Sequence, residues 1–182
     1  MVLYTPGDFM KCIFLDFDGV INNWYHFDGV CTENALILKK IIELTGAKVV
    51  ATTSNKYSFQ RKEPVEYLKS AYYREYVSVL NELGIIIDDV TPYCKENRSL
   101  EIKSYLSEHE VESFVIVDDE LISEDLQEHQ VFLDLYKGLE EHHIEPIINI
   151  LNNKLGFYPN DYDRTETSME LLIRINKYYN TK

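Results

Sequence analysis

Short apolar runs that stop at polar residues alternate along this chain with segments of helical periodicity. The apolar runs predict buried strands at Lys11–Leu15, Lys48–Ala51, Ile85–Ile87, Phe114–Val117 and Val131–Leu133. Strands that alternate with helices require crossover connections, which are right-handed and place helices on both faces of a parallel sheet. The sequence therefore predicts the α/β class, with a doubly wound, Rossmann-like sheet.

Apolar residues spaced three and four apart predict the helices between these strands. Thr32 is the expected N-cap of the first helix, and Gly46 is its expected C-terminal stop. Further helical faces are predicted over Val65–Leu83, around Ile102–Leu106 and over Glu140–Leu151. Thr167 and Glu170 form a capping box for a last helix.

The length of 182 residues suits one packed domain better than two. Hydrophobic residues at 45% and charged residues at 27% are ordinary for a globular protein and exclude a wholly disordered chain. The polar stretch Pro159–Asp163 marks a linker. We therefore expect one domain over residues 1–156, followed by a linker and C-terminal helix over residues 157–182.

The formal net charge of −13 restricts the partners of the chain. Nucleic acids and anionic membrane surfaces attract Lys and Arg, so we expect no strong nonspecific binding to nucleic acid and no membrane partner. The sequence contains no apolar run of transmembrane length, and Met1–Pro6 lacks the features of a signal peptide. These observations predict a cytoplasmic protein.

Cysteine and histidine residues give no sign of a zinc site or of a disulfide framework. Cys12, Cys31 and Cys94 are odd in number and widely spaced. His142 and His143 lie in a predicted helix, where a surface pair is the expected arrangement. This pattern predicts that the three cysteines are reduced thiols with structural roles.

Polar side chains follow three of the predicted strands. Asp16 and Asp18 come after the first, Thr52 and Thr53 after the second, and the pair Asp118-Asp119 ends a later one. Ligands of open parallel sheets bind beyond the carboxyl ends of the strands. Carboxylates gathered there repel one another unless a cation neutralises them, and oxygen ligands suit Mg²⁺. The sequence therefore predicts a magnesium site held by Asp16, Asp18, Asp118 and Asp119.

The carboxylates that follow the first strand suit phosphoryl transfer. Asp16 is placed to attack phosphorus and form an aspartyl-phosphate, which divides one difficult displacement into two easier ones. Asp18 is placed to protonate the leaving oxygen and then to take a proton from water. Gly19 lets the chain turn away tightly after Asp18.

The other predicted site residues would bind the phosphate. Hydroxyls of Thr52 and Thr53 can hold its non-bridging oxygens, and a cation on a neighbouring helix can offset the accumulated charge. Arg98, at the expected start of a helix, is the preferred cation, with Lys95 and Lys103 as alternatives.

The ordered motifs resemble the haloacid dehalogenase (HAD) superfamily of phosphatases. The matching residues are Asp16, Asp18, Gly19 and Val20, then Thr52 or Thr53, then Arg98, and finally Asp118 and Asp119. The resemblance implies a HAD-like fold, a Mg²⁺ cofactor, and phosphomonoester hydrolysis through an aspartyl-phosphate.

In detail the chain is similar to the HAD-like domain of the Swiss-army-knife RNA-repair proteins. The likeness spans Lys11 to Leu151, and its points are the segments Phe14–Asn22 and Thr45–Val50, Arg98 with Glu101-Ile102, Val117–Asp119, and Gly138-Leu139. That branch tends to have Trp-Arg where this chain has Asn55-Lys56. Gly19, Ser54 and Asn55 are the expected substrate contacts.

The spacing of the motifs leaves no room for a large inserted domain. The resemblance to capless HAD proteins implies an open active site. The expected substrate is therefore a phosphorylated small molecule or a phosphate on a macromolecule. The aromatic segment Trp24–Phe27 would form a small lid, stack on a base or sugar, or pack in the core.

Three other functions remain alternatives to a general phosphatase. The resemblance suggests a nucleotide or polynucleotide end phosphatase in RNA or DNA repair, whereas the acidic composition favours smaller substrates. A non-catalytic module that keeps the fold is a second alternative. The third is a phosphoacceptor receiver domain, in which the acidic pair follows the first strand and the acceptor Asp comes later; this chain has the reverse order.

Overall fold

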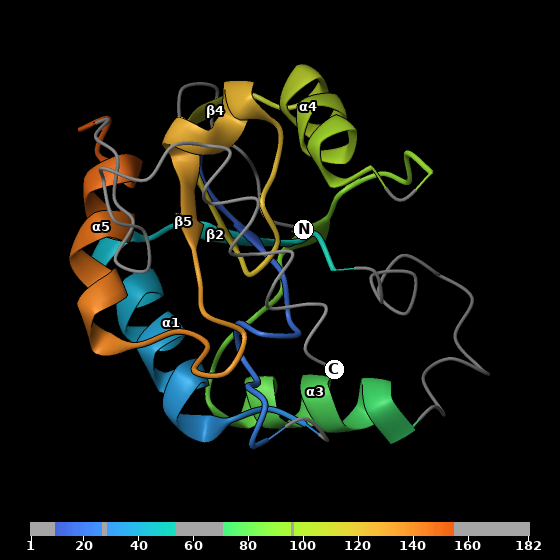
Figure 1. Ribbon diagram of the computed structural model, residues 1–182, viewed down its shortest axis with the longest axis vertical. Coiled ribbons are helices and arrows are strands. Elements are labelled where there is room, and N and C mark those ends of the chain that lie inside the picture. Colours follow the sequence, from blue (N-terminus) through green and yellow to red (C-terminus); the bar gives the residue numbers. More distant parts are fainter. Residues whose placement is uncertain (1–9, 27–28, 54–70, 96, 155–182) are drawn as a thin grey trace, which may run out of the picture.

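The computed structural model describes residues 10–26, 29–53, 71–95 and 97–154. Its strands form one parallel sheet in the order β3-β2-β1-β4-β5 (Figure 1). The strands are β1 (Met10–Leu15), β2 (Lys48–Ala51), β3 (Asp89–Val90), β4 (Val111–Asp118) and β5 (Gln130–Phe132). The predicted α/β class and parallel sheet are confirmed.

Helices cover both faces of the sheet. They are α1 (Thr32–Thr45), α3 (Ala71–Glu82), α4 (Arg98–Glu108) and α5 (Ile144–Leu151), with the short 3₁₀ helices η2 (Glu124–His129) and η3 (Glu141–His143). Figure 1 shows α4 on the opposite side of the sheet from α1 and α5. This arrangement is the predicted doubly wound one and is consistent with a HAD-like Rossmannoid fold.

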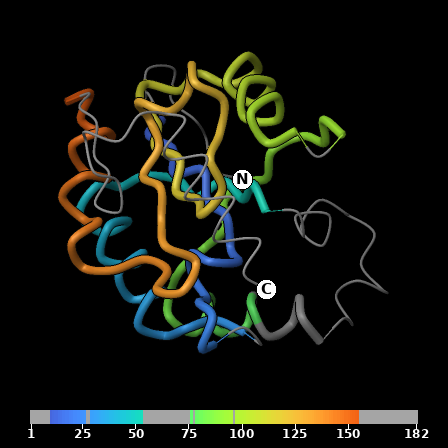
Figure 2. The backbone as a smooth tube through the Cα atoms, in the orientation of Figure 1, coloured from blue at the N-terminus to red at the C-terminus, as the bar shows by residue number. Residues whose placement is uncertain are grey.

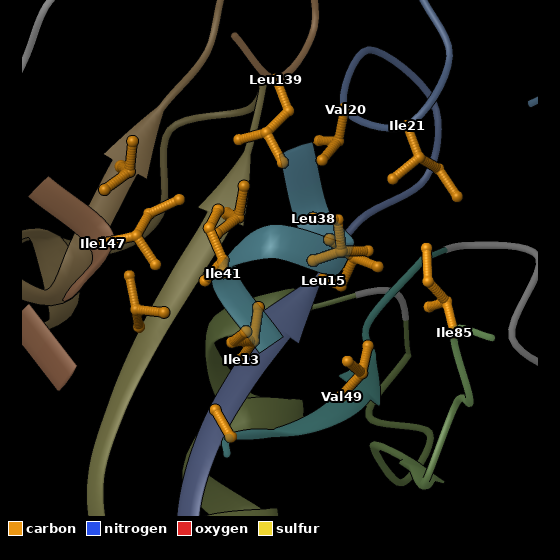
Figure 3. Close-up of a cluster of buried hydrophobic side chains, with 14 of the residues drawn as sticks. Ile13, Leu15, Val20, Ile21, Leu38, Ile41, Val49, Ile85, Leu139 and Ile147 are labelled. Carbon is orange, nitrogen blue, oxygen red and sulfur yellow. The ribbon is translucent and has the colours of Figure 1, made fainter. Parts of the chain in front are cut away.

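The larger hydrophobic core lies beneath α1 and α5. Ile13 and Leu15 of β1 meet Leu38 and Ile41 of α1 there, and Ile147 of α5 approaches the same cluster (Figure 3). Each such side chain contributes roughly 1.5–3 kcal/mol when it is fully buried. This core fixes the face and the register of β1, and therefore the position of the residue that follows it.

The opposite face of β1 packs against α4. Cys12 and Phe14, which alternate with the isoleucine and leucine of the first core, meet Ile102 and Tyr105 of α4. The rings of Phe14 and Tyr105 form an edge contact with centroids 5.5 Å apart. Because β1 is buried on both faces, its sequence is a continuous apolar run rather than an alternating one.

The third predicted strand is wrong in position. Ile85 is buried but Ile86 is 66% exposed, and sheet pairing begins only at Asp89–Val90. The Asp88 N–H donates to the Val49 carbonyl at 2.9 Å, and Asp88 Oδ2 accepts from the Val49 N–H at 2.9 Å. The isoleucines therefore precede the strand and do not form it. The apolar run instead reflects the burial of Ile85 in the core.

Two expected helix starts differ from those observed. Cys31, not Thr32, is the N-cap of α1, and its side chain makes no capping hydrogen bond; Gly46 ends the helix as predicted, with φ +66°. The expected helix over Glu140–Leu151 begins with the 3₁₀ helix η3 before α5.

The expectation of a surface histidine pair is wrong for His143. Its side chain is fully buried, and its Nδ1 accepts from the Glu140 N–H at 2.9 Å. Burial lowers its pKa from 6.5 to about 3, with a smaller contribution from His142. His143 is therefore a neutral, structural group that closes the turn before α5.

The segment after β5 returns to the segment after β1, as the chain path in Figure 2 shows. The Leu139 N–H donates to the Val20 carbonyl at 2.9 Å, and Asn34 Nδ2 donates to the Leu139 carbonyl at 2.7 Å. Gly138 has φ +68°, and an added Cβ would lie 2.7 Å from the Val20 carbonyl oxygen. This close approach explains the glycine and fixes the loop that follows β1.

No helix in the described part of the chain is long and apolar enough to cross a membrane. The described residues between Asp18 and Thr52 form a loop, α1 and β2. Residues 54–70 and the predicted linker and last helix lie outside the described residues. The absence of a large cap and the domain boundary at residue 156 therefore stay predictions.

Candidate active site

The carboxyl ends of three neighbouring strands bring the predicted site residues together. Leu15 pairs with Ala51 on one side and with Val117 on the other, so the residues that follow are adjacent. The Asp16 N–H donates to the Val117 carbonyl at 3.1 Å, and the Thr52 N–H donates to the Leu15 carbonyl at 2.8 Å. The predicted convergence of polar strand ends is confirmed.

Three carboxylates form a compact cluster at this edge. One oxygen from each of Asp16, Asp118 and Asp119 lies within 4.8 Å of the others. Asp16 is 4% exposed and Asp118 is fully buried. Like charges this close and this poorly hydrated strongly disfavour simultaneous ionisation.

Arg98 is the cation that joins this cluster. Its Nη1 donates to Asp16 Oδ2 at 3.0 Å and to Asp118 Oδ2 at 2.5 Å. The residue opens α4, whose N-cap Asn97 accepts from the Leu100 N–H. Neither alternative cation shares this position: Lys103 pairs with Asp125 at 2.7 Å, and Lys95 is exposed.

The pKa values of the cluster reflect burial first and mutual repulsion second. Burial and the Asp16 charge raise the pKa of Asp118 to about 7. Burial, Asp16 and Asp118 raise the pKa of Asp119 to about 8. Burial also raises the pKa of Asp16, although Arg98 opposes the shift. Burial alone would lower the pKa of Arg98, but Asp118 and Asp16 hold it above its ordinary value.

The carboxylate cluster fits a divalent metal ion. Its donors are oxygen atoms, which Mg²⁺ prefers, and they come from three side chains on two adjacent strand ends. Among the described residues Arg98 is the cation that contacts these carboxylates, and their pKa values stay raised by burial and by mutual repulsion. Asp16, Asp118 and Asp119 are the residues that would hold the ion.

Asp18 occupies a different environment and is not part of this cluster. Its Oδ1 accepts from Asn22 Nδ2 at 2.8 Å and from the Tyr76 hydroxyl at 3.4 Å. The charge of Asp18 raises the pKa of Asp16, but by less than burial does. Asp18 therefore lies near the nucleophile position, but its predicted role as a fourth metal ligand gains no support from the carboxylate cluster.

Gly19 is required by the backbone and by its neighbour. It has φ +73°, and an added Cβ would lie 2.5 Å from both Cγ and Oδ2 of Asp119. Only glycine allows the turn after Asp18 to come this close to the carboxylate. The structure thus gives Gly19 a steric role beside a candidate metal ligand, and its predicted substrate contact stays a prediction.

The two threonines differ in their contacts. The Thr53 side chain makes a hydrogen bond with Asp16, which lowers the pKa of that carboxyl. Thr52 is 1% exposed, and its Oγ1 has no hydrogen-bond partner among the described residues. A buried hydroxyl without a partner is costly, so Thr52 is suited to accept or donate a bond when a ligand arrives. Ser54 and Asn55 lie outside the described residues.

The aromatic segment after the first acidic motif is exposed where it is described. Trp24 is 41% exposed and Tyr25 is 80% exposed, so core packing is wrong for these two residues. The Trp24 ring lies against Tyr136, with centroids 5.5 Å apart. The loops after β1 and β5 therefore present aromatic rings to solvent.

Asn22 and Tyr76 are polar contacts that the sequence interpretation missed. Tyr76 precedes Leu80 by four positions, and this helical spacing could have identified it as a buried residue. Asn22 carries no periodic signal, because its role depends on the turn that follows Asp18.

The family comparison agrees with this geometry. Residues 12–144 match the family model described as the HAD domain in Swiss Army Knife RNA repair proteins. The chain belongs to this family. The match begins within β1 and ends at the first residue of α5, and so includes every candidate site residue named above. No curated protein and no solved structure matches the chain.

Proposed function

We propose that this HAD domain is a Mg²⁺-dependent phosphomonoester hydrolase with Asp16 as its nucleophile. The observation that carries the proposal is the position of Asp16 at the end of β1, within reach of Asp118, Asp119 and Arg98. Nucleophilic attack on phosphorus needs a carboxylate surrounded by positive charge, because the phosphate brings further negative charge. Arg98 supplies part of that charge.

In the first step an Asp16 oxygen attacks phosphorus, and the bond from phosphorus to the ester oxygen breaks. Asp18 gives its proton to the departing oxygen, which leaves as an alcohol, and Asp16 becomes an aspartyl-phosphate. Arg98 and Thr53, which already contact Asp16, are placed to hold the non-bridging oxygens as charge builds on them.

In the second step water replaces Asp16 on phosphorus. Asp18, now ionised, takes one water proton as the oxygen attacks, and the bond from phosphorus to Asp16 breaks. Inorganic phosphate leaves, Asp16 regains its charge, and Asp18 regains its proton. A bound Mg²⁺ would supply electrostatic stabilisation of the transferring phosphoryl oxygens.

A nucleotide or polynucleotide end phosphatase is the second candidate. The family is described by its occurrence in RNA repair proteins. Trp24 and Tyr25, exposed on the loop that follows Asp18, are side chains on which a base can stack. The net charge of −13 favours a nucleotide or a short end over a long polyanion.

Phosphate release from an aryl phosphate, measured with and without Mg²⁺, tests the proposal. We expect turnover that a chelator abolishes and that Asp16→Asn lowers by at least about a thousandfold. Asp125→Asn is the matched control, because Asp125 is an exposed aspartate paired with Lys103. A full-length protein that releases no phosphate from aryl phosphates, nucleotides, sugar phosphates, phosphopeptides or end-phosphorylated oligonucleotides is a non-catalytic module instead.

A further inference from the structure

Asp18 is held by two side chains that have no place in the mechanism so far. Asn22 Nδ2 donates to Asp18 Oδ1 at 2.8 Å and to the Tyr76 hydroxyl at 2.6 Å. The Tyr76 hydroxyl in turn lies 3.4 Å from Asp18 Oδ1. The three groups form a closed triangle in which both neighbours point donors at one carboxyl oxygen.

The two neighbours are themselves rigidly placed. Asn22 and Tyr76 are both fully buried. The side-chain Oδ1 of Asn22 accepts from the Gly19 N–H at 2.7 Å, which determines that the Nδ2 end of the amide faces Asp18. The Tyr76 ring stacks on Phe17, with centroids 5.6 Å apart and planes 6° from parallel. Neither side chain can follow Asp18 if the carboxyl rotates.

The donor count decides which oxygen of Asp18 carries the proton. An amide nitrogen has two N–H groups, and Asn22 uses one for Asp18 and one for Tyr76. The Tyr76 oxygen accepts from Asn22, and its hydroxyl proton is donated to Asp18 Oδ1. An oxygen that faces two donors is a poor place for a proton, so a protonated Asp18 carries it on Oδ2.

We propose that Asn22 and Tyr76 are positioning residues that hold Asp18 Oδ1 as an acceptor and thereby assign proton transfer to Oδ2. This inference rests on the proposed function, because it specifies how the general acid and base of that reaction is oriented. It also gives α3 a part in the site through Tyr76, which lies 58 positions after Asp18 in the sequence.

The dependence of rate on the leaving group separates a positioning role from a structural one. A nitrophenolate departs without help from an acid, whereas a phenolate or an alkoxide needs the proton in the transition state. A misplaced Asp18 therefore slows esters of poor leaving groups more than esters of good ones. General damage to the fold slows all of them by the same factor.

Tyr76→Phe is the test, because it removes the hydroxyl and keeps the ring that stacks on Phe17. We expect kcat/KM for phenyl and alkyl phosphates to fall about tenfold, a part of what a positioned acid contributes, while p-nitrophenyl phosphate stays within about twofold. Tyr105→Phe is the matched control: it is a buried tyrosine whose hydroxyl donates to Asp89 at 3.1 Å. Tyr105→Phe should leave unchanged the ratio of kcat/KM for phenyl phosphate to kcat/KM for p-nitrophenyl phosphate.

Asn22→Asp is the second variant, for use if Tyr76→Phe does not fold. It keeps the oxygen that accepts from Gly19 and replaces the donor facing Asp18 by another oxygen. Loss of the donor to Asp18 Oδ1 should shift the ratio of kcat/KM between esters in the same direction as Tyr76→Phe does. An unchanged ratio in the folded variants overturns the inference while the proposed function stands; a wild-type protein that hydrolyses none of the esters overturns the proposed function itself.

Discussion

The carboxylate cluster and Asp18 lie at the same edge of the sheet but are stabilised in opposite ways. The carboxylate cluster of Asp16, Asp118 and Asp119 has Arg98 as its bridging cation, and the pKa of each carboxyl is raised. Asp18 instead meets neutral donors. The first arrangement favours binding of positive charge, whereas the second fixes the direction of a carboxyl group.

Removal of Arg98 should disturb the carboxylate cluster most. Arg98→Met leaves buried carboxylates without their cation, so we expect the free energy of unfolding at neutral pH to fall by about 3 kcal/mol. We also expect kcat/KM to fall by about two to three orders of magnitude. Denaturant unfolding and phosphate release measure the two effects.

Arg98→Lys is the control for that loss. One guanidinium nitrogen, Nη1, makes both short contacts, so a single ammonium in its place should restore part of the stability and of the rate. Equal behaviour of the Met variant and the wild type would show that the bridge to Asp16 and Asp118 has no energetic role.

A methyl group at Gly19 should push the turn after Asp18 away from Asp119. Gly19→Ala places a Cβ 2.5 Å from Asp119 at a positive φ, so we expect a loss of about 2–3 kcal/mol from strain and displacement together. Gly46→Ala is the matched control, because Gly46 has a similar φ of +66° and no atom within 4 Å of an added Cβ. It should lose only about 1 kcal/mol. Equal losses in thermal unfolding would exclude the steric contact with Asp119.

Loss of one carboxylate should weaken the metal site more than the fold. Asp119→Asn removes a charged oxygen ligand, and we expect the affinity for Mg²⁺ to fall at least about tenfold, or about 1.4 kcal/mol, in titration calorimetry. Glu120→Gln is the control, since Glu120 is an exposed neighbour of the same charge. A similar loss in both variants would indicate that general charge, not ligation, attracts the ion.

The stability of the metal-free protein should depend on pH through the same carboxylates. Asp118 and Asp119 have folded-state pKa values of about 7 and about 8, above their ordinary value of 3.8. Between pH 3.8 and these folded-state pKa values, the native state binds more protons than the unfolded state. The free energy of unfolding therefore falls as pH rises through this range. We expect a loss of at least about 1.4 kcal/mol between about pH 5 and about pH 8 in chelator, and little loss with saturating Mg²⁺.

The pH slope in chelator should be smaller in Asp119→Asn, which lacks one of the titrating groups. An equal slope with and without Mg²⁺ would mean that the ion does not bind these carboxylates. His143, whose pKa is lowered from 6.5 to about 3, gives the opposite slope below pH 6.5 and offsets part of the loss at the acid end of this range.

The sequence predicted the carboxylate cluster well because hydrophobic patterning determines where strands end. Once Leu15, Ala51 and Val117 are buried side by side, the next residues must lie at one edge. Arg98 followed from its position at a helix start near that edge. These residues are specified locally, by the strand or helix that carries each of them.

The surroundings of Asp18 could not be predicted in the same way. The contact with Tyr76 depends on how α3 packs across the loop after β1, and no local pattern encodes a hydroxyl meeting a carboxylate 58 positions away. The misplaced strand at Ile85–Ile87 has a related cause: apolar character reports burial, and burial occurs outside strands as well. His143 likewise became buried through one turn of backbone hydrogen bonding to Glu140.

Substitutions of the two threonines after β2 should have the smallest effects on stability and the most specific effects on the reaction. Thr52→Val removes a buried hydroxyl that has no partner among the described residues, so we expect the free protein to gain up to about 1 kcal/mol of stability. Thr53→Val removes a hydrogen bond to Asp16 and should lose about 1 kcal/mol. If Thr52 binds phosphate oxygens, Thr52→Val should nevertheless raise KM or lower kcat/KM about tenfold. A variant that is both more stable and fully active would leave Thr53 as the threonine that contacts the phosphate.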